Sequence, residues 1–154
     1  MGLRWTLGRL EQLGPLDVYD LLALRCAVFV VEQSCIFQDP DGVDKHSHHL
    51  LGRDERGALQ AVLRIVDPGV KYAEPSIGRV ISSPAVRRSG VGRELMAQGL
   101  AQSRRLWPGH PIRISAQARL ERFYQDFGFR TVTDPYLEDD IPHVEMLLEP
   151  DTST

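Results

Sequence analysis

Apolar residues recur at helical spacing in three segments of the chain. After Pro15, a residue favoured in the first turn of a helix, they predict a helix over residues 16–31. The expected members of its apolar stripe include Leu16, Tyr19, Leu22 and Val28. One apolar stripe opposite Arg and Gln predicts a second helix over residues 91–106. A short third helix is predicted over residues 120–127, where Gly128 ends it.

Short branched or alternating apolar runs predict the strands. They lie at residues 3–7, 49–52, 58–66, 77–82, 112–116, 129–132 and 144–148. The acceptors and glycine of residues 54–57 predict a tight hairpin turn between the second and third runs. The order of strands and helices predicts an α+β (mixed α/β) fold, with a parallel strand pair wherever a helix crosses between strands.

Composition bounds the class of protein. The 154 residues, of which 42% are hydrophobic and 25% charged, are typical of one globular domain, which we expect over residues 1–149. Residues 150–154 have little to bury and are predicted to be a disordered tail. Cys26 and Cys35 fit neither a zinc pattern nor a disulfide framework. Cys26 lies in an apolar helical run and is predicted to be a small core residue, with Cys35 more exposed.

Charge and hydropathy limit the partners. A net charge of -3 gives no general reason to attract nucleic acid or an anionic membrane. No window reaches the ~18 apolar residues of a spanning helix, and residues 1–5 lack the order of a signal peptide. We therefore expect a cytoplasmic protein with neither nucleic acid nor membrane as a partner.

A local basic site is nevertheless indicated in the middle of the chain. Arginine is concentrated there, at Arg79, Arg87, Arg88, Arg93, Arg104 and Arg105, whereas lysine occurs only at Lys45 and Lys71. The predicted strand at 77–82 leads through Gly90 and Gly92 into the second helix. The first N–H groups of a helix lack internal partners and its dipole is positive there, so this turn suits a phosphate.

Two nucleotide-binding motifs are excluded at this turn. A phosphate-binding loop of the ATPase type needs Lys and Ser or Thr where Arg93 and Glu94 stand. A dinucleotide fingerprint needs a third glycine where Leu95 stands. On these residues alone, the alternative that the glycine-rich turn merely ends a strand, with no ligand, is not excluded.

The turn and a second segment together resemble a known family. Arg87, Gly90 and Gly92 after the strand at 77–82 are similar to the acetyl-CoA signature of the GNAT superfamily of N-acetyltransferases. The aromatic segment 123–129, with Tyr124, resembles the second block of that superfamily. Similarity to the ElaA-type branch extends over the segments 24–33, 39–44, 114–118 and 138–143. The resemblance implies a three-layer GNAT-like fold with a twisted mixed sheet of six to seven strands, splayed centrally between the strands ending near Ser82 and Ala116.

The resemblance also implies acetyl-CoA (coenzyme A) as the cofactor. Backbone groups of Ile81 and Ser82 are expected to bind the pantetheine arm at a splayed strand edge. The pyrophosphate is expected at Arg87, Arg88, Ser89, Gly90, Val91, Gly92 and Arg93. Gln117 is also expected to bind the cofactor, although many members carry an Asn in its place that touches the cofactor arm, so Gln117 is a departure from the family pattern.

Catalysis is expected to use direct attack of an amine on the thioester. Tyr124 matches the tyrosine that lies near the thioester sulfur in many relatives, where a phenol can protonate the departing thiolate. The alternative is that it packs as one aromatic among its neighbours. Candidate bases that remove the proton of the amine are Glu32, His48, His49 and His143.

The acidic segment 34–47 reads as a long loop. Asp39, Asp41 and Asp44 lack the terminal glutamate of a calcium loop, so no metal is expected. The carboxylates are instead predicted to pair with Arg25 or Arg64 and to shape the acceptor site. The residues expected to bind the acceptor are Arg25, Phe29, Asp44 and Glu138, together with the neighbourhood of Tyr136 and His143.

The partner is expected to be an amine acceptor, a small molecule or a peptide, and the acids near it suit a cationic amine. Arg25 and Phe29 followed by spaced acids also resemble the acyl-homoserine lactone synthases, although residues 35–37 lack the Trp usual there. A non-catalytic acyl-CoA sensor is a third hypothesis, which Tyr124 disfavours. Paired strands near the carboxyl terminus would support a homodimer.

Overall fold

A computed structural model describes residues 2–150, so all but the first residue of the tail predicted at residues 150–154 lies outside the described part. Eight strands form one mixed sheet in the order β1-β2-β3-β4-β5-β8-β6, with β7 also paired to β8. Their bounds are β1 (Arg4–Gly8), β2 (Ser47–Arg53), β3 (Leu59–Val66), β4 (Ser76–Ser82), β5 (Ile112–Gln117), β6 (Arg130–Thr131), β7 (Tyr136–Glu138) and β8 (Ile141–Leu148). The count exceeds the predicted six to seven because β7 is only three residues long and has no apolar run.

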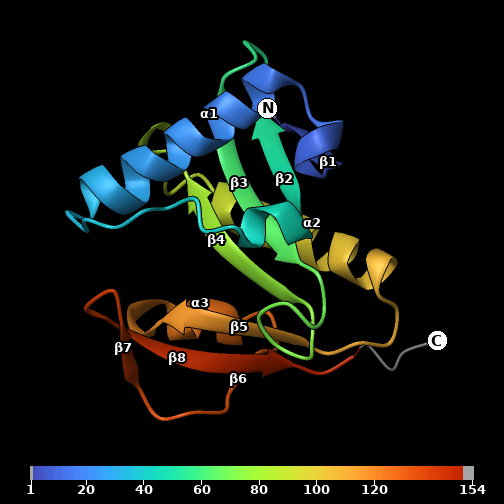
Figure 1. Cartoon of the computed structure of the whole chain (residues 1–154), viewed down its shortest axis with the longest axis vertical. Coiled ribbons are helices and arrows are strands. Elements are labelled where there is room, and N and C mark those ends of the chain that lie inside the picture. The colour runs from blue at the N-terminus through green and yellow to red at the C-terminus, as the bar shows by residue number, and fades with distance from the viewer. Residues whose placement is uncertain (1, 151–154) are drawn as a thin grey trace.

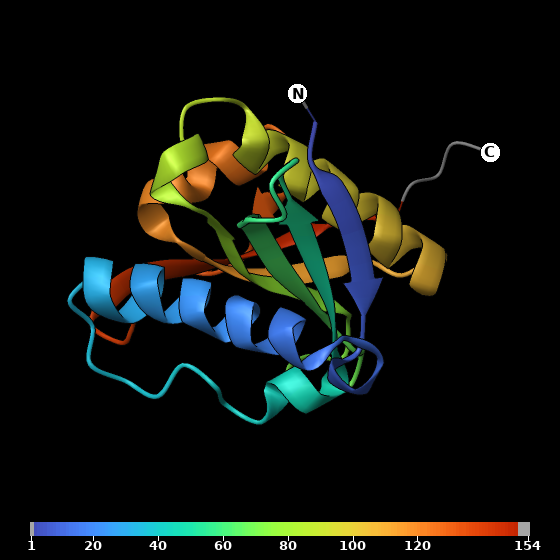
Figure 2. The ribbon, with the colours of Figure 1, turned by 90° about the horizontal axis from the view of Figure 1, so that it is seen from above.

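Helices cover both faces of this sheet. α1 (Pro15–Arg25) is extended by a π-helical segment (Cys26–Glu32) and crosses one face, whereas α2 (Val91–Leu106) and α3 (Glu121–Gln125) lie on the other (Figure 2). Single 3-10 turns occupy Leu10–Gln12, Val43–His46, Pro84–Val86 and Ala118–Leu120. The predicted three-layer α+β architecture is confirmed.

The buried face of the first helix differs from the predicted stripe at its start and agrees with it at Val28. Leu16 and Tyr19 are 77% and 71% exposed, whereas Leu21, Arg25 and Val28 are buried. Those three positions are spaced four and three residues apart and therefore share one side of the helix. Cys26 directly follows Arg25 and is turned away, so it is exposed, and Cys35 is the less exposed cysteine. Both cysteine predictions are wrong.

Two hydrophobic clusters hold the layers together. The larger packs Leu95, Met96 and Leu100 of α2 against the sheet, and the smaller packs Leu21 and Val28 against its opposite face. The stripe of α2 is thus close to the predicted one. These contacts fix the first turn of α2 relative to the end of β4.

The sheet opens between β4 and β5, which form a parallel pair. β4 and β5 pair at Ser76 and Arg113 and nowhere further along, and the two strands diverge from that end (Figure 1). Each of the other strand pairs is antiparallel. Residues 77–82 of β4 therefore present backbone donors and acceptors toward β5 that no strand takes up. The predicted splay is confirmed.

The hairpin of β2 and β3 follows the predicted turn. Asp54 Oδ1 accepts hydrogen bonds from the backbone N–H groups of Arg56, at 2.9 Å, and Ala58, at 3.0 Å. Gly57 adopts a φ of 83°, which a glycine takes without strain. Within residues 2–150, no helix has the length and apolar character needed to cross a membrane.

Candidate active site

A cleft runs between β4 and β5 in two connected parts. The outer cavity, of about 300 Å³, reaches from Ser82 and Arg87 to Gln117. The inner cavity, of about 90 Å³, continues to Tyr124, Glu138 and His143. Both parts are lined by Phe29, Val80, Gln117 and Leu120. The divergence of the two parallel strands thus produces a groove that leads from the glycine-rich turn to the predicted acid.

The glycine-rich turn has the geometry of an anion site. Gly90 precedes α2 with a φ of 88°, a conformation that favours glycine. A Cβ at Gly90 or Gly92 would meet no atom within 4 Å, so the space before the helix is open. The first N–H groups of this 16-residue helix point into that space without intrahelical partners. The residues present fit a phosphate of the cofactor.

Arg87 lies at the mouth of the outer cavity and pairs with Glu32. Its Nη1 and Nη2 lie 2.5 and 2.8 Å from Glu32 Oε2 and Oε1. The hydrogen bond from Arg87 lowers the pKa of Glu32. A carboxylate held in this way is a weak proton acceptor, which counts against Glu32 as the base. The widened π-helical turn, in which Gln33 N donates to Val28 O at 3.2 Å, places Glu32 here.

The other arginines of the turn take different directions. Arg88 has a φ of 67° and is exposed. Arg93 Nη2 lies 2.9 Å from Asp126 Oδ2, and its guanidinium lies over the ring of Phe123. Its side chain therefore braces the end of α3. The contribution of Arg93 to an anion site is its backbone N–H in the first turn of α2.

The cleft walls include the other predicted cofactor residues. Ser82 lines the outer cavity, and the side chain of Ile81 is buried with the smaller core cluster while its backbone belongs to the open edge of β4. Gln117 Oε1 accepts a hydrogen bond of 3.0 Å from Arg119 Nε. Its Nε2 lies 3.5 Å from Gln33 Oε1. Gln117 is therefore held by Arg119 and Gln33, which line the same outer cavity.

Tyr124 lies at the inner end of the cleft. Only 7% of the residue is exposed, and it packs edge-on against Phe123 and Phe129. Burial raises the pKa of Tyr124 to about 12. The phenol therefore keeps its proton at neutral pH and can donate it. Aromatic packing and a place in the cleft are both present, so the two interpretations of this residue are compatible.

A polar cluster faces Tyr124 across the inner cavity. His143 Nδ1 lies 2.7 Å from the carbonyl oxygen of Ile141, which fixes the N–H at Nδ1 in the neutral ring. Nε2 lies 3.4 Å from Glu138 Oε2. Ser115 Oγ hydrogen-bonds Tyr136 and lies 3.4 Å from Glu138 Oε1. Burial raises the pKa of Tyr136.

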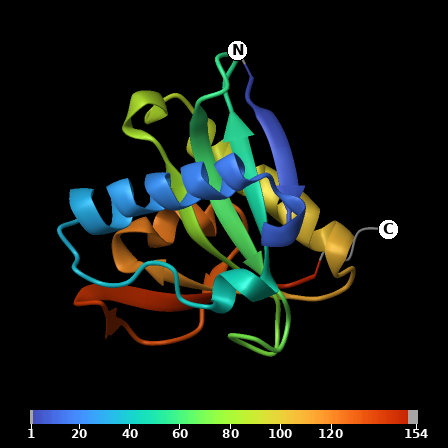
Figure 3. The same cartoon turned by 45° about the horizontal axis from the view of Figure 1, so that its top comes forward.

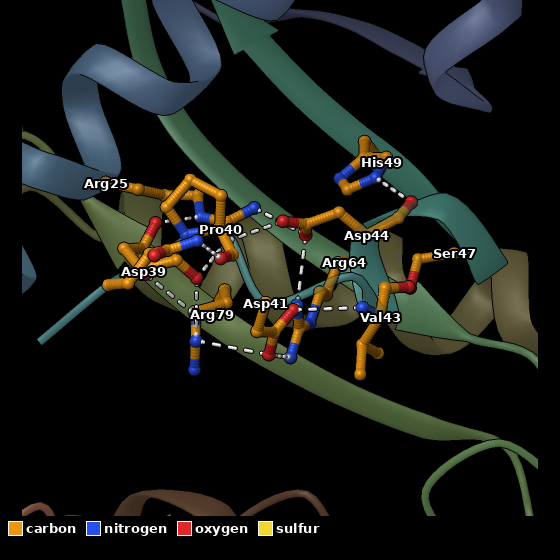
Figure 4. A network of polar contacts seen from close by, with 11 residues as sticks. Arg25, Asp39, Pro40, Asp41, Val43, Asp44, Ser47, His49, Arg64 and Arg79 are labelled. Carbon is orange, nitrogen blue, oxygen red and sulfur yellow. Dashed lines mark hydrogen bonds and ion pairs between the residues drawn. The ribbon is translucent and has the colours of Figure 1, made fainter.

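Buried arginines form ion pairs with the aspartates of the acidic loop (Figure 4). Arg25 Nε lies 2.7 Å from Asp39 Oδ2, and Arg25 Nη1 lies 2.7 Å from Asp44 Oδ1. Arg64 Nη1 lies 2.8 Å from Asp41 Oδ1 and 3.0 Å from Asp44 Oδ1. The predicted pairing of the loop with Arg25 and Arg64 is confirmed. Among residues 2–150, no group of three or more His, Cys, Asp or Glu could hold a metal ion.

Two residues predicted to contact the acceptor are too buried to do so. Arg25 is 0% exposed, and Asp44 is 6% exposed and bound to both Arg25 and Arg64. The loop that follows α1 doubles back alongside the helix (Figure 3), so Arg25 at the end of α1 and Asp44 meet in an ion pair that is closed to solvent. The corrected role of Arg25 and Asp44 is to fix the loop. Phe29 and Glu138, by contrast, line the inner cavity.

Arg79 is a site residue that sequence reasoning missed. It lies in β4 with a φ of 50°, where the register with β3 shifts. Its guanidinium lies over the rings of Phe29 and Phe37, and Nε lies 2.9 Å from Asp39 Oδ1. The acidic loop thus holds the irregular part of β4 in place. The concentration of arginine in the middle of the chain includes Arg79, but no local pattern marks its conformation.

Two of the four candidate bases lie away from the cleft. His49 is fully buried, and its Nε2 lies 3.0 Å from the carbonyl oxygen of Asp44. His48 packs edge-on against Trp107. Neither lines the outer or the inner cavity. The alternation of β2 sends these neighbouring side chains to opposite faces of the sheet, and His143 is the histidine that lines the inner cavity.

An open strand edge that leads from a helix N-terminus to a buried phenol defines an acyltransferase of the acyl-CoA-dependent class. The chain matches the family described as acetyltransferase (GNAT) domain over residues 42–150. It is 46% identical to protein ElaA of Escherichia coli over 144 residues, which cover 90% of this chain and 92% of that protein. It belongs to the GNAT acetyltransferase family, in the branch that contains ElaA, and is an N-acetyltransferase.

Solved structures agree with this assignment. The crystal structure of an acyl-CoA N-acyltransferase from Pseudomonas aeruginosa superposes with a TM-score of 0.90 at 44% identity, covering 95% of this chain and 99% of that one. The structure of E. coli ElaA gives 0.89 at 42% identity, covering 96% and 99%. The AHL synthase LasI gives 0.76 at 16% identity, covering 96% and 89%, which shows a shared fold alone.

Proposed function

We propose that this protein transfers an acetyl group from acetyl-CoA to the primary amine of a small molecule or peptide. The observation that carries the proposal is the single groove from the glycine-rich turn to Tyr124. One end of this groove suits phosphates and the other end holds groups that exchange protons. Acetyl-CoA, when bound, supplies a thioester whose acyl carbon accepts the amine nitrogen.

The chain offers a distinct partner for each part of the cofactor. The first N–H groups of α2, beside Gly90 and Gly92, would hold the pyrophosphate. Arg87 lies at the mouth and can turn from Glu32 to an anionic oxygen, since both side chains are partly exposed. The unpaired edge of β4 at Ile81 and Ser82 serves the amides of the pantetheine arm.

Two side chains of the inner cavity move the protons. In the proposed reaction a C–N bond forms between acyl carbon and amine while the C–S bond breaks. Nε2 of His143 accepts the proton that the amine loses, directly or through water, because Nδ1 is fixed as a donor. Tyr124 gives a proton to the departing sulfur, since burial keeps its phenol protonated. Glu32, paired with Arg87, takes no part in this step.

The acceptor enters on the side of Glu138. Glu138 lines the inner cavity beside His143, and its carboxylate suits the ammonium form of an amine. The acidic loop and the β7–β8 hairpin meet nearby, where Cys35 Sγ lies 3.6 Å from the carbonyl oxygen of Asp139. These two segments form the rim through which the acceptor would pass.

Calorimetry with acetyl-CoA, followed by a thiol-release assay over a panel of amines, tests the proposal. We expect binding, and CoA release that depends on an amine and gives an acetylated product of the corresponding mass. Binding without turnover for every amine would indicate an acyl-CoA sensor. A lactone product formed only with S-adenosylmethionine would indicate a homoserine lactone synthase. Absence of acetyl-CoA binding would overturn the proposed function itself.

A further inference from the structure

A third cavity continues the cleft beyond the position proposed for the acetyl group. It has a volume of about 40 Å³ and shares Gly78, Arg79, Ser115 and Glu138 with the inner cavity. Lys71, in the loop between β3 and β4, lines this cavity but not the inner one. An acceptor whose nitrogen points toward Tyr124 and His143 can therefore extend into the space that Lys71 lines.

Two opposite charges remain in this third cavity once its arginines are accounted for. The charged residues that line it are Arg64, Lys71, Arg79 and Glu138. Arg64 is engaged by Asp41 and Asp44, and Arg79 by Asp39 and Asp41. Together with Arg25, these arginines match the three aspartates of the acidic loop one to one. The charges of the cavity outside this balanced network are the ammonium of Lys71 and the carboxylate of Glu138.

Lys71 has no carboxylate partner of its own. No ion pair among residues 2–150 includes it, although Glu138 lies near enough to influence it electrostatically. The residue as a whole is exposed, but burial of its ammonium group and the charge of Arg64 lower its pKa. An anion bound here would relieve the repulsion between these cations.

We propose that the acceptor is an amine that carries a carboxylate a few bonds from the reactive nitrogen, as an α-amino acid does, and that Lys71 binds this carboxylate. Glu138 lines the inner and the third cavity and meets the ammonium group before it loses its proton, whereas Lys71 lines the third cavity alone. These two opposite charges orient a zwitterion in one sense only. The small volumes favour a free amino acid over a polypeptide segment.

This inference rests on the proposed acetyl transfer and narrows its substrate. The test measures kcat/KM at saturating acetyl-CoA for α-amino acids, each paired with its own α-carboxamide. The amide keeps size and shape but lacks the negative charge. For at least one pair we expect a preference for the acid of about tenfold or more, the usual strength of a hydrogen-bonded ion contact.

Variants of Lys71 separate recognition from intrinsic amine reactivity. Lys71→Met should reduce the acid-to-amide ratio at least about tenfold, mainly through a higher KM for the acid, and Lys71→Arg should restore most of it. Lys45→Met removes the other lysine, on the exposed 3-10 turn before β2, and should leave the ratio unchanged. Each variant should bind acetyl-CoA as the wild type does, which shows that it is folded.

Several results would overturn the inference. These are equal use of acids and amides by the wild type, an unchanged ratio in Lys71→Met, or turnover confined to amines without a carboxylate. Acetyl-CoA binding with no amino acid accepted would also overturn it. Loss of acetyl-CoA binding by the wild type would instead refute the proposed function, so the two failures are distinguishable.

Discussion

Glu32 Oε2 lies 2.5 Å from Arg87 Nη1, which joins the end of the first helical segment to the turn before α2. The cofactor mouth is thus bridged by an ion pair whose cation is also suited to the pyrophosphate. The hydrogen bond from Arg87 lowers the pKa of Glu32, so the pair persists throughout the neutral pH range. An anionic ligand must compete with this carboxylate for Arg87.

Glu32→Gln should therefore tighten acetyl-CoA binding. Loss of the competing charge frees Arg87, and for an exposed ion pair we expect a decrease in Kd of about two- to fivefold. Arg87→Met should raise Kd about tenfold. Calorimetric titration measures both. A loss of kcat of more than about a hundredfold in Glu32→Gln, with Kd unchanged, would make Glu32 the base after all.

Alanine substitutions at two glycines of α2 provide a matched test of the phosphate-binding turn. A Cβ at Gly92 meets no protein atom, whereas a Cβ at Gly99 would lie 2.6 Å from Leu63 Cδ2. Gly92→Ala should keep the Tm and raise the Kd for acetyl-CoA about tenfold or more, because its methyl group blocks the approach to the helix N-terminus. Gly99→Ala should instead lower the free energy of unfolding by about 1–3 kcal/mol.

Thermal unfolding and acetyl-CoA titration of the two variants distinguish these effects. If Gly92→Ala bound acetyl-CoA as tightly as the wild type, the pyrophosphate would have to bind elsewhere. Unaltered stability in Gly99→Ala would show that Leu63 moves aside at little cost.

Tyr124→Phe should lower kcat about a hundredfold at neutral pH and leave the Kd for acetyl-CoA unchanged. Single-turnover kinetics, with transfer shown to limit the rate, measure this effect, and a full rate in the variant would end the acid role. Burial raises the pKa of Tyr124 to about 12, above the ~10 of an unfolded tyrosine.

The raised pKa of Tyr124 also predicts how the stability of the protein depends on pH in the alkaline range. Between pH ~10 and 12 the unfolded chain binds fewer protons at Tyr124 than the folded one, so stability falls as pH rises. Tyr124→Phe should lose less stability over this range. Denaturant unfolding of both proteins at a series of pH values measures the difference. Parallel curves would contradict the raised pKa.

Asp41→Asn should make the protein less stable at neutral pH and less sensitive to acid. Burial alone would raise the pKa of Asp41, but the hydrogen bond and charge of Arg64 and the charge of Arg79 outweigh it, and the pKa falls to about 2. The stabilisation is therefore complete above the unfolded value of 3.8 and is lost as pH falls through about 2.

After allowance for solvent screening, we expect this stabilisation to be about 1–2 kcal/mol. Urea unfolding between pH 7 and 2 should show a flatter pH profile for Asp41→Asn than for the wild type. Exposed Asp140, which appears in none of the ion pairs of residues 2–150, provides the matched control in Asp140→Asn. Equal profiles for the three proteins would contradict the role of Asp41.

The order of elements and the cofactor end of the site could be predicted from the sequence, because they depend on local patterns. The branched apolar run of 58–66, the apolar stripe of α2 and the glycines at 90 and 92 are each patterns within a short segment of the chain. The turn before α2 is formed by consecutive residues, and Tyr124 belongs to a contiguous aromatic segment. The sequence therefore predicted these features in the correct strands, helices and turns.

Only the tertiary structure decided what distant segments do together. The buried face of α1 depends on which side meets the sheet, so Leu16 and Cys26 were misplaced. Arg25 was expected to touch the acceptor, but its ion pairs with the acidic loop, which doubles back alongside α1, are closed to solvent. The contact of Glu32 with Arg87 spans 55 positions. Contacts of such separation are set by the packing of the layers, because no local periodicity records which side chains will meet.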